Sequence, residues 1–144
     1  MYTPEDIEKL ASDILKASNL SISGDIVDGE SRNTGSDEDI TVKTLSLGDG
    51  DTQLGTVNVS FYCKDIADEG NENVNYKPNN EKLNLVIKEI STAFNGNYGV
   101  YGKWGNFFIE SFSPLYRNEK VSEHFKVVRL RFRMKSLNDN PNYN

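Results

Sequence analysis

Two stretches of the chain place apolar residues three or four positions apart, which is the spacing of one face of an α-helix. The first stretch covers residues 4–17. Its apolar residues are Ile7, Leu10, Ile14 and Ala17. Thr3 suits the cap of this helix and Pro4 suits its first turn. We expect the helix to end just before Asn19.

The second helix is predicted over residues 80–94. Its apolar stripe consists of Leu83, Val86, Ile87, Ile90 and Phe94. Gly96, just beyond the stripe, suits a C-terminal stop.

Strict alternation of apolar and polar residues predicts strands elsewhere. It is clearest at residues 57–63 and at 124–137, where four apolar residues alternate with four basic ones. Residues 40–47 form a further strand with a bulge expected at Lys43–Thr44. The GDGD turn at residues 48–51 joins it to the strand at 57–63, which predicts a hairpin. Residues 21–28 are expected to form a short strand or an extended arm, and further strands are expected at residues 98–104 and 107–112.

The order of these elements predicts an α+β fold, in which an antiparallel β-sheet carries two α-helices packed on its apolar face. Residues 28–39 and 65–80 hold few apolar side chains and are expected to form long polar loops. We expect one α+β domain over residues 1–137, followed by a disordered, Asn-rich tail at residues 138–144.

The composition leaves little material for catalysis. The chain has 144 residues, of which 36% are apolar and 26% charged, a size that fits one domain. No apolar run approaches the ~18 residues of a membrane span, and the N-terminus does not resemble a secretion signal. The single cysteine, Cys63, excludes an internal disulfide framework and a Cys-rich zinc site. The single histidine, His124, removes most hydrolytic and metal chemistry. Cys63 continues the inward phase of its strand. We therefore expect no enzyme, no cofactor and no metal ion.

Charge is divided unevenly along the chain, although the formal net charge is −6. Residues 25–72 hold 12 acids and 3 bases, whereas residues 120–135 hold 6 bases and 1 acid. The acidic candidates for a subunit interface are Asp37, Glu38, Asp39, Asp49 and Asp51. The basic candidates are Arg129, Arg131, Arg133 and Lys135, which a period of two places on one face of the last strand.

Two interpretations of this charge pattern stay open. The two segments can neutralise each other within one fold, with Glu110, Glu119 or Glu123 as cross-strand partners of the arginines. Alternatively, the basic stripe meets an acidic surface of an adjacent copy, or DNA that passes close by.

Glycine recurs at every third position in GNYGVYGKWG, residues 96–105. The spacing matches neither a phosphate-binding loop nor collagen, so a twisted hairpin is the simplest interpretation. The functional alternative is an exposed loop that contacts a partner through Tyr98, Tyr101 and Trp104, because tyrosine and tryptophan are common interface anchors.

The layout resembles the phage tail-terminator and tail-completion proteins of the virion neck. The features that carry the resemblance are a helix, an acidic loop, a hairpin ending in GTVNVSFYCKD, a second helix and a closing strand, HFKVVRLRFRMK. The resemblance implies a structural protein of the virion, assembled in the host cytoplasm, without catalytic residues. Such proteins form a homo-oligomeric ring, commonly of six copies, that caps the tail tube and joins it to neck or connector proteins. DNA passes through the ring without sequence-specific binding.

A second class of function is a monomeric module that binds a small molecule or carbohydrate through residues 96–105. In that case Tyr98, Tyr101 and Trp104 would stack on the ligand.

Overall fold

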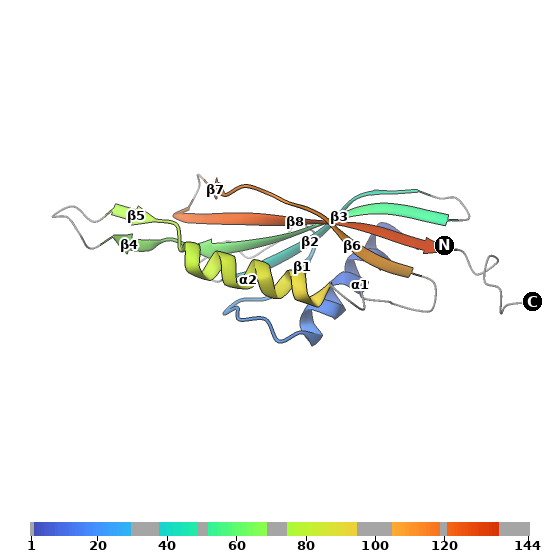
Figure 1. The fold of residues 1–144 in the computed structure, drawn as a ribbon, viewed down its shortest axis with the longest axis horizontal. Helices are drawn as coiled ribbons and strands as arrows, with labels where there is room; N and C mark the ends of the chain where they lie inside the picture. The colour runs from blue at the N-terminus through green and yellow to red at the C-terminus, as the bar shows by residue number, and fades with distance from the viewer. Residues whose placement is uncertain are drawn as a thin grey trace, which may run out of the picture.

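Two helices lie against one face of a β-sheet in a computed structural model that describes residues 2–29, 38–48, 52–68, 75–94, 105–118 and 121–135 (Figure 1). In chain order the elements are α1 (Pro4–Ala17), β1 (Ile26–Asp28), β2 (Ile40–Leu47), β3 (Thr52–Lys64), β4 (Ile66–Asp68), β5 (Asn75–Lys77), α2 (Asn80–Ala93), β6 (Gly105–Phe112), β7 (Tyr116–Asn118) and β8 (Glu123–Lys135). The predicted α+β class is confirmed.

Helix α1 begins at its predicted cap. The Thr3 hydroxyl accepts a hydrogen bond from the Asp6 N–H (3.2 Å), and the Asp6 carboxylate accepts one from the Thr3 N–H (2.8 Å), which makes a capping box. The predicted buried face is wrong at Ala17, which is exposed, whereas Ala11 and Leu15 are buried. Ala17 is the last residue of the helix and lies at the edge of the buried face, about 120° around the axis from Ala11.

Helix α2 follows its prediction closely. The Asn79 side chain accepts a hydrogen bond from the Lys82 N–H (3.2 Å) and caps the first turn. The helix ends with Phe94 as its C-cap, while Gly96 lies outside the described residues. All five residues of the predicted apolar stripe are buried.

The main sheet has the strand order β1-β2-β3-β8-β6, with β7 paired to β8 off this path. The predicted β2–β3 hairpin is confirmed, and its register shifts between Thr44 and Ser46, one residue beyond the expected bulge. The two longest strands, β3 and β8, pair over their full length, from Thr52 opposite Lys135 to Lys64 opposite Glu123.

The sheet is mixed rather than wholly antiparallel, because β1 pairs with β2 in parallel. This corrects the sequence prediction. A strand of three residues carries too little of an alternating pattern to fix its direction. Helix α1 is tied to this strand by the buried Ser12, whose hydroxyl donates a hydrogen bond to the Asp28 carboxylate.

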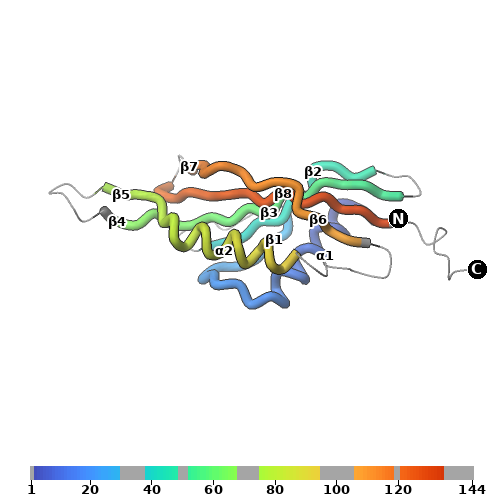
Figure 2. The backbone as a smooth tube through the Cα atoms, in the orientation of Figure 1, coloured from blue at the N-terminus to red at the C-terminus, as the bar shows by residue number. Residues whose placement is uncertain are grey.

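The core fills the space between the two helices and one face of the sheet. Its largest fully buried side chains are Phe61, Phe94, Phe107 and Phe132, from β3, the end of α2, β6 and β8. The Phe107 ring contacts both Phe94 (5.5 Å between centroids) and Phe132 (5.1 Å). Both helices lie on the same side of the strands, so the other face of the sheet carries no described helix (Figure 2).

Two segments form strands that the sequence analysis did not predict. Residues 65–80, expected as a polar loop, contain β4 and β5, which pair with each other and project beyond the end of the main sheet (Figure 1). Strand β7 pairs with the beginning of β8. Strands of three residues are too short for alternation to distinguish them from polar loops.

Candidate functional site on the open sheet face

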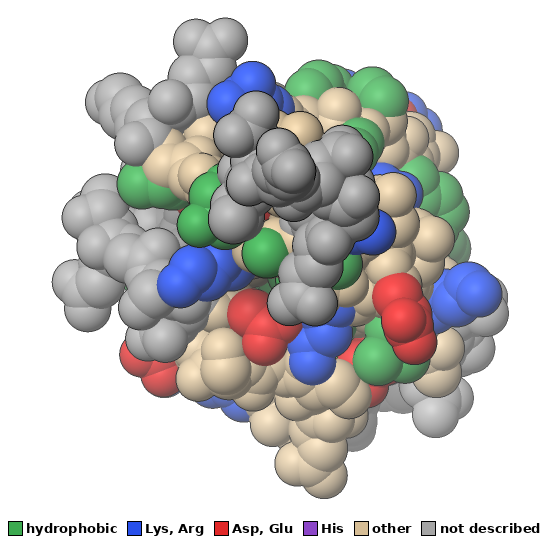
Figure 3. All heavy atoms as spheres, turned by 90° about the vertical axis from the view of Figure 1, so that its left-hand side faces the viewer, with side chains coloured by type: hydrophobic (Ala, Val, Ile, Leu, Met, Phe, Trp, Pro, Cys, Tyr) green, Lys and Arg blue, Asp and Glu red, His purple; other side chains and the backbone are tan. Residues whose placement is uncertain are grey.

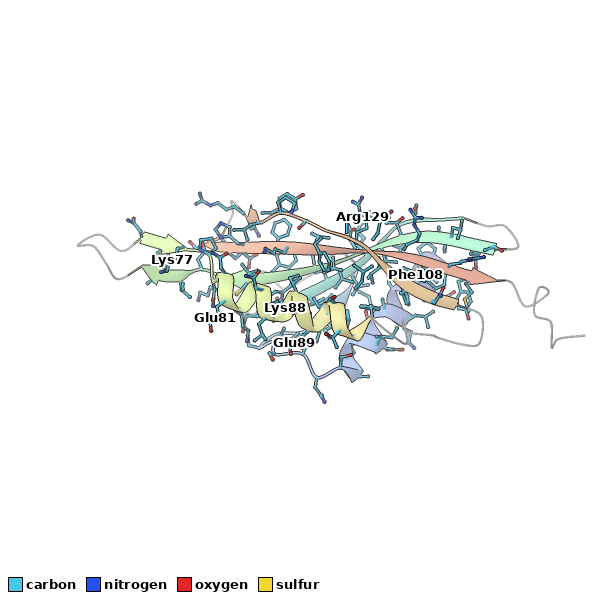
Figure 4. All side chains as sticks on the ribbon, in the orientation of Figure 1. Lys77, Glu81, Lys88, Glu89, Phe108 and Arg129 are labelled. Carbon is cyan, nitrogen blue, oxygen red and sulfur yellow. The ribbon has the colours of Figure 1, made fainter. Side chains whose placement is uncertain are left out.

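The face of the sheet opposite the helices is the candidate interaction surface, and we call it the open face. Along β8, side chains alternate between the core and this face. The buried members are Val128, Leu130, Phe132 and Met134, and the exposed members include Arg129, Arg131 and Arg133. Figure 4 shows Arg129 on the side of the sheet away from α2. The predicted common face of these three arginines is therefore confirmed.

The strands that flank the arginine stripe supply almost no negative charge. Opposite Arg129, Arg131 and Arg133, strand β3 places Asn58, Thr56 and Leu54, and strand β6 places Ser111, Phe108 and Asn106. Strand β3 contains no acidic residue. The exception is Glu110, at the register shift of β6, whose carboxylate lies 2.8 Å from Arg131. The expected cross-strand partner of the stripe is thus confirmed for one arginine.

The other two arginines have weaker or no such partners. Arg129 donates a hydrogen bond to the Asn58 side chain at 3.3 Å. Within the described ranges, no carboxylate forms an ion pair with Arg133. An exposed ion pair such as Arg131–Glu110 contributes about 0–1 kcal/mol, so positive charge remains along the stripe.

One end of the open face is hollowed into an apolar groove with charged walls, which we call the end groove. Its apolar lining includes Leu54 (55% exposed) and Phe108 (39% exposed), and Thr52 and Ile109 complete the lining with Glu110, Arg131 and Arg133. Its volume is about 750 Å³, within the range of pockets that accept a large side chain or a small ligand.

The opposite end of the open face carries three aromatic rings. The rings of Tyr62 and Phe125 stack at 4.9 Å, and Tyr116 of β7 lies 5.3 Å from Phe125. These cross-strand contacts attach β7 to the sheet.

The acidic candidates that the structure describes do not lie beside the arginines. Glu38 and Asp39 precede β2, next to the end of β3, because the Asp39 carbonyl accepts a hydrogen bond from the Tyr62 N–H. The Glu38 carboxylate lies 3.8 Å from the Lys82 ammonium, and the buried Asp39 carboxylate accepts the Asp25 N–H at 3.0 Å. Both carboxylates therefore serve contacts within the chain.

Cys63 and His124 face each other across β3 and β8, but neither is arranged as a nucleophile or its base. The Cys63 thiol is buried and lies 3.7 Å from the Glu38 carboxylate. Burial, together with the charge of Glu38, raises the pKa of Cys63 to about 12, so the thiol stays protonated. His124 Nδ1 instead lies 2.6 Å from the Asp65 carboxylate, a contact between distant residues that no sequence pattern indicated.

The remaining candidates lie outside the described residues. These are Asp37, Asp49, Asp51, Tyr98, Tyr101 and Trp104. For Lys135 only the backbone position opposite Thr52 is described. No group of three or more His, Cys, Asp or Glu side chains in the described ranges could hold a metal ion.

Comparison with known proteins adds no relative. The chain matches no protein-family model and no curated protein. Neither described helix has the length and apolar character needed to cross a membrane.

Proposed function

We propose that this chain is a structural protein of a phage or prophage virion, which assembles into a ring at the junction of head and tail. The ring caps the tail tube, contacts tube and neck proteins, and leaves a channel through which DNA passes. The observation that carries the proposal is the open face, where three exposed arginines lie between strands that offer one carboxylate. A face of this kind is suited to a protein partner that brings negative charge.

The charge distribution supports assembly from identical copies. A ring built head to tail needs two different, complementary patches on each subunit. The basic stripe of β8 supplies one patch, and the acids concentrated in residues 25–72 supply charge of the opposite sign. The net charge of −6 also favours a channel along which DNA slides, because strong phosphate binding needs an excess of positive potential.

The resemblance to tail-terminator and tail-completion proteins supports the same function. It rests on the order of helix, hairpin, helix and closing strand, which the fold contains as α1, β2–β3, α2 and β8. The assignment to the neck of a phage virion rests on that resemblance. The open face supports self-association.

Light scattering across a hundredfold range of protein concentration tests the self-association. We expect a closed oligomer near six copies of the 16.2-kDa chain, with its mass falling as salt is raised. The variant Arg129→Glu/Arg131→Glu/Arg133→Glu should lose assembly while keeping the far-UV circular dichroism of the native chain.

A matched control distinguishes the open face from net charge alone. The variant Lys9→Glu/Lys16→Glu/Lys88→Glu changes the formal charge equally, but its three exposed lysines lie on α1 and α2. This control should assemble like the native chain. Equal loss in both variants would show that general repulsion, rather than the arginine stripe, controls assembly.

The place of the ring is tested on virus particles produced by the organism that encodes the chain. Gold-labelled antibody against the chain should mark the head–tail junction in electron micrographs. Particles that contain no label, or label along the tube or on the head, would rule out the neck assignment.

A further inference from the structure

Strands β4 and β5 form a small arm that leaves the main sheet at the end of β3. The arm comprises Ile66–Asp68 and Asn75–Lys77, paired only with each other. Its base is fixed, because Asp65 contacts His124 through its carboxylate and donates its N–H to the Ser122 carbonyl. An isolated two-stranded ribbon is marginally stable in water, so a projecting arm gains stability when another surface covers it.

The arm exposes apolar side chains on both of its faces. Tyr76, which is 61% exposed, shares one face with Ala67, and Ile66, which is 41% exposed, shares the other with Lys77. Tyr76 is the most exposed of the large hydrophobic side chains that the structure describes. Seen from this end of the molecule, apolar side chains lie among basic and acidic ones (Figure 3). Tyrosine is enriched among the residues that dominate interface binding energy.

The end groove lies at the other end of the same strand. Leu54 lines the groove and Ile66 begins the arm, and Ile66 follows Leu54 by 12 positions, which span about 40 Å at a strand's rise of about 3.3 Å per residue. Figure 4 shows Lys77 of the arm and Phe108 of the groove far apart along the long axis of the molecule. The arm and the end groove of one copy therefore cannot meet.

The arm segment and the end groove are complementary in charge and in exposed apolar side chains. Residues 65–77 carry four acids and one lysine by sequence. The end groove places two guanidinium groups, of Arg131 and Arg133, against one carboxylate, of Glu110, beside exposed Leu54 and Phe108. The segment that contains the arm is therefore acidic by sequence, and with its projecting tyrosine it complements a positively charged groove with an apolar lining.

We propose that the arm of one copy docks in the end groove of the next, with Tyr76 against Leu54 and Phe108. This inference rests on the self-association in the proposed function and identifies the two surfaces that would carry it. The contact is heterologous, because each copy offers its arm to one neighbour and its groove to another. Repetition of such a contact gives a ring when the rotation closes.

Complementation between two defective variants tests the contact directly. The variant Tyr76→Ser lacks the arm anchor, and the variant Leu54→Ser/Phe108→Ser lacks the apolar lining of the groove. Each alone should need at least about tenfold more protein to associate, the loss typical of an interface anchor. Mixed together, they should form a dimer of about twice the 16.2-kDa chain mass and nothing larger, because each retains one competent end.

The control is Leu85→Ser, which removes an exposed apolar side chain from α2, at neither end. This variant should associate like the native chain. If both test variants associate normally, or if their mixture gives no dimer, the arm-to-groove contact is wrong even when the native chain forms rings.

A covalent trap covers the case in which the native chain is monomeric at every concentration. Tyr76→Cys and Leu54→Cys, mixed under mild oxidation, should form a disulfide-linked heterodimer, while buried Cys63 does not compete. Its absence would overturn the contact. The gold-labelling experiment decides the neck assignment separately, so the two proposals fail on different measurements.

Discussion

Replacing Gly55 by alanine tests whether the β2–β3 hairpin is as tightly paired at its bulged end as the structure indicates. Gly55 lies opposite Leu47, just beyond the register shift, and is buried. A Cβ atom built on Gly55 would lie 2.7 Å from the Ser46 carbonyl oxygen and 3.0 Å from Leu47 Cδ1. The nearer atom belongs to the backbone, so strand β2 itself would have to move.

The magnitude follows from two opposing effects. Alanine restricts the unfolded chain more than glycine does, which favours the folded state by about 0.4–1 kcal/mol where the backbone tolerates it. Forcing an extra methyl group into a close-packed site costs about 1–3 kcal/mol. The overpacking term is the larger, so we expect Gly55→Ala to lower the free energy of unfolding by about 0.5–2 kcal/mol.

Gly48 provides the matched control within the same hairpin. A Cβ atom there would make ordinary contacts with the Leu54 backbone, at 3.6 and 3.9 Å, and Gly48 is exposed. Gly48→Ala should therefore leave stability unchanged or raise it by up to about 1 kcal/mol.

Urea unfolding of both variants measures the difference, at one low protein concentration so that association does not contribute. The midpoint for Gly55→Ala should fall with little change in the slope. A Gly55→Ala variant as stable as the native chain would mean that β2 and β3 are not in such close contact beside the bulge.

Three further predictions concern the core and a helix cap. Burial raises the pKa of Cys63 from 9.0 to about 12, so at pH 8 the thiolate should be about a thousandfold rarer in the native chain than in the unfolded chain. A chromogenic disulfide should therefore label the native protein only as it opens. The same shift implies that the free energy of unfolding falls as pH rises above 9. Thr3→Ala should cost about 0.5–2 kcal/mol in urea unfolding near pH 7. Hydrogen bonds with Thr3, the one from its backbone N–H first, hold the pKa of Asp6 below its ordinary 3.8, so the stability that the Asp6 carboxylate contributes should be lost as pH falls below that value. Phe94→Ala should cost about 3–5 kcal/mol in calorimetry, since the ring is buried against Phe107.

The elements predicted most accurately are those whose two sides differ in polarity over many residues. Helix α2 buries all five residues of its predicted stripe, and β8 alternates between core and surface as its sequence does. In both cases one shift of register would exchange an apolar side for a charged one, so the pattern fixes the orientation. The outward arginines of the candidate site follow from the same alternation.

What the sequence could not predict depends on contacts between distant segments. Hydropathy does not tell which strands flank β8, and the positive stripe depends on strand β3, which contains no acidic residue, lying beside it. The His124–Asp65 contact at the base of the arm joins residues 59 positions apart. The arm itself is too short to produce a pattern, and only its pairing and exposure reveal it.

The distribution of acidic residues among the strands explains how an acidic chain can present a basic surface. Strands β2 and β3 contain no acidic residue. The one acidic residue of β8 is Glu123, which lies at the arm end of the strand and accepts a hydrogen bond from the Asn118 side-chain amide. Among the described residues of these strands, Glu110 on β6 is the one carboxylate beside the arginine stripe. A solvated sheet face that had no partner would gain from alternating charges across neighbouring strands, since four like charges in a row repel. Strand β3 offers no such compensation, and the arm-to-groove contact proposed above would supply the negative charge from the acidic sequence of residues 65–77 in a second copy.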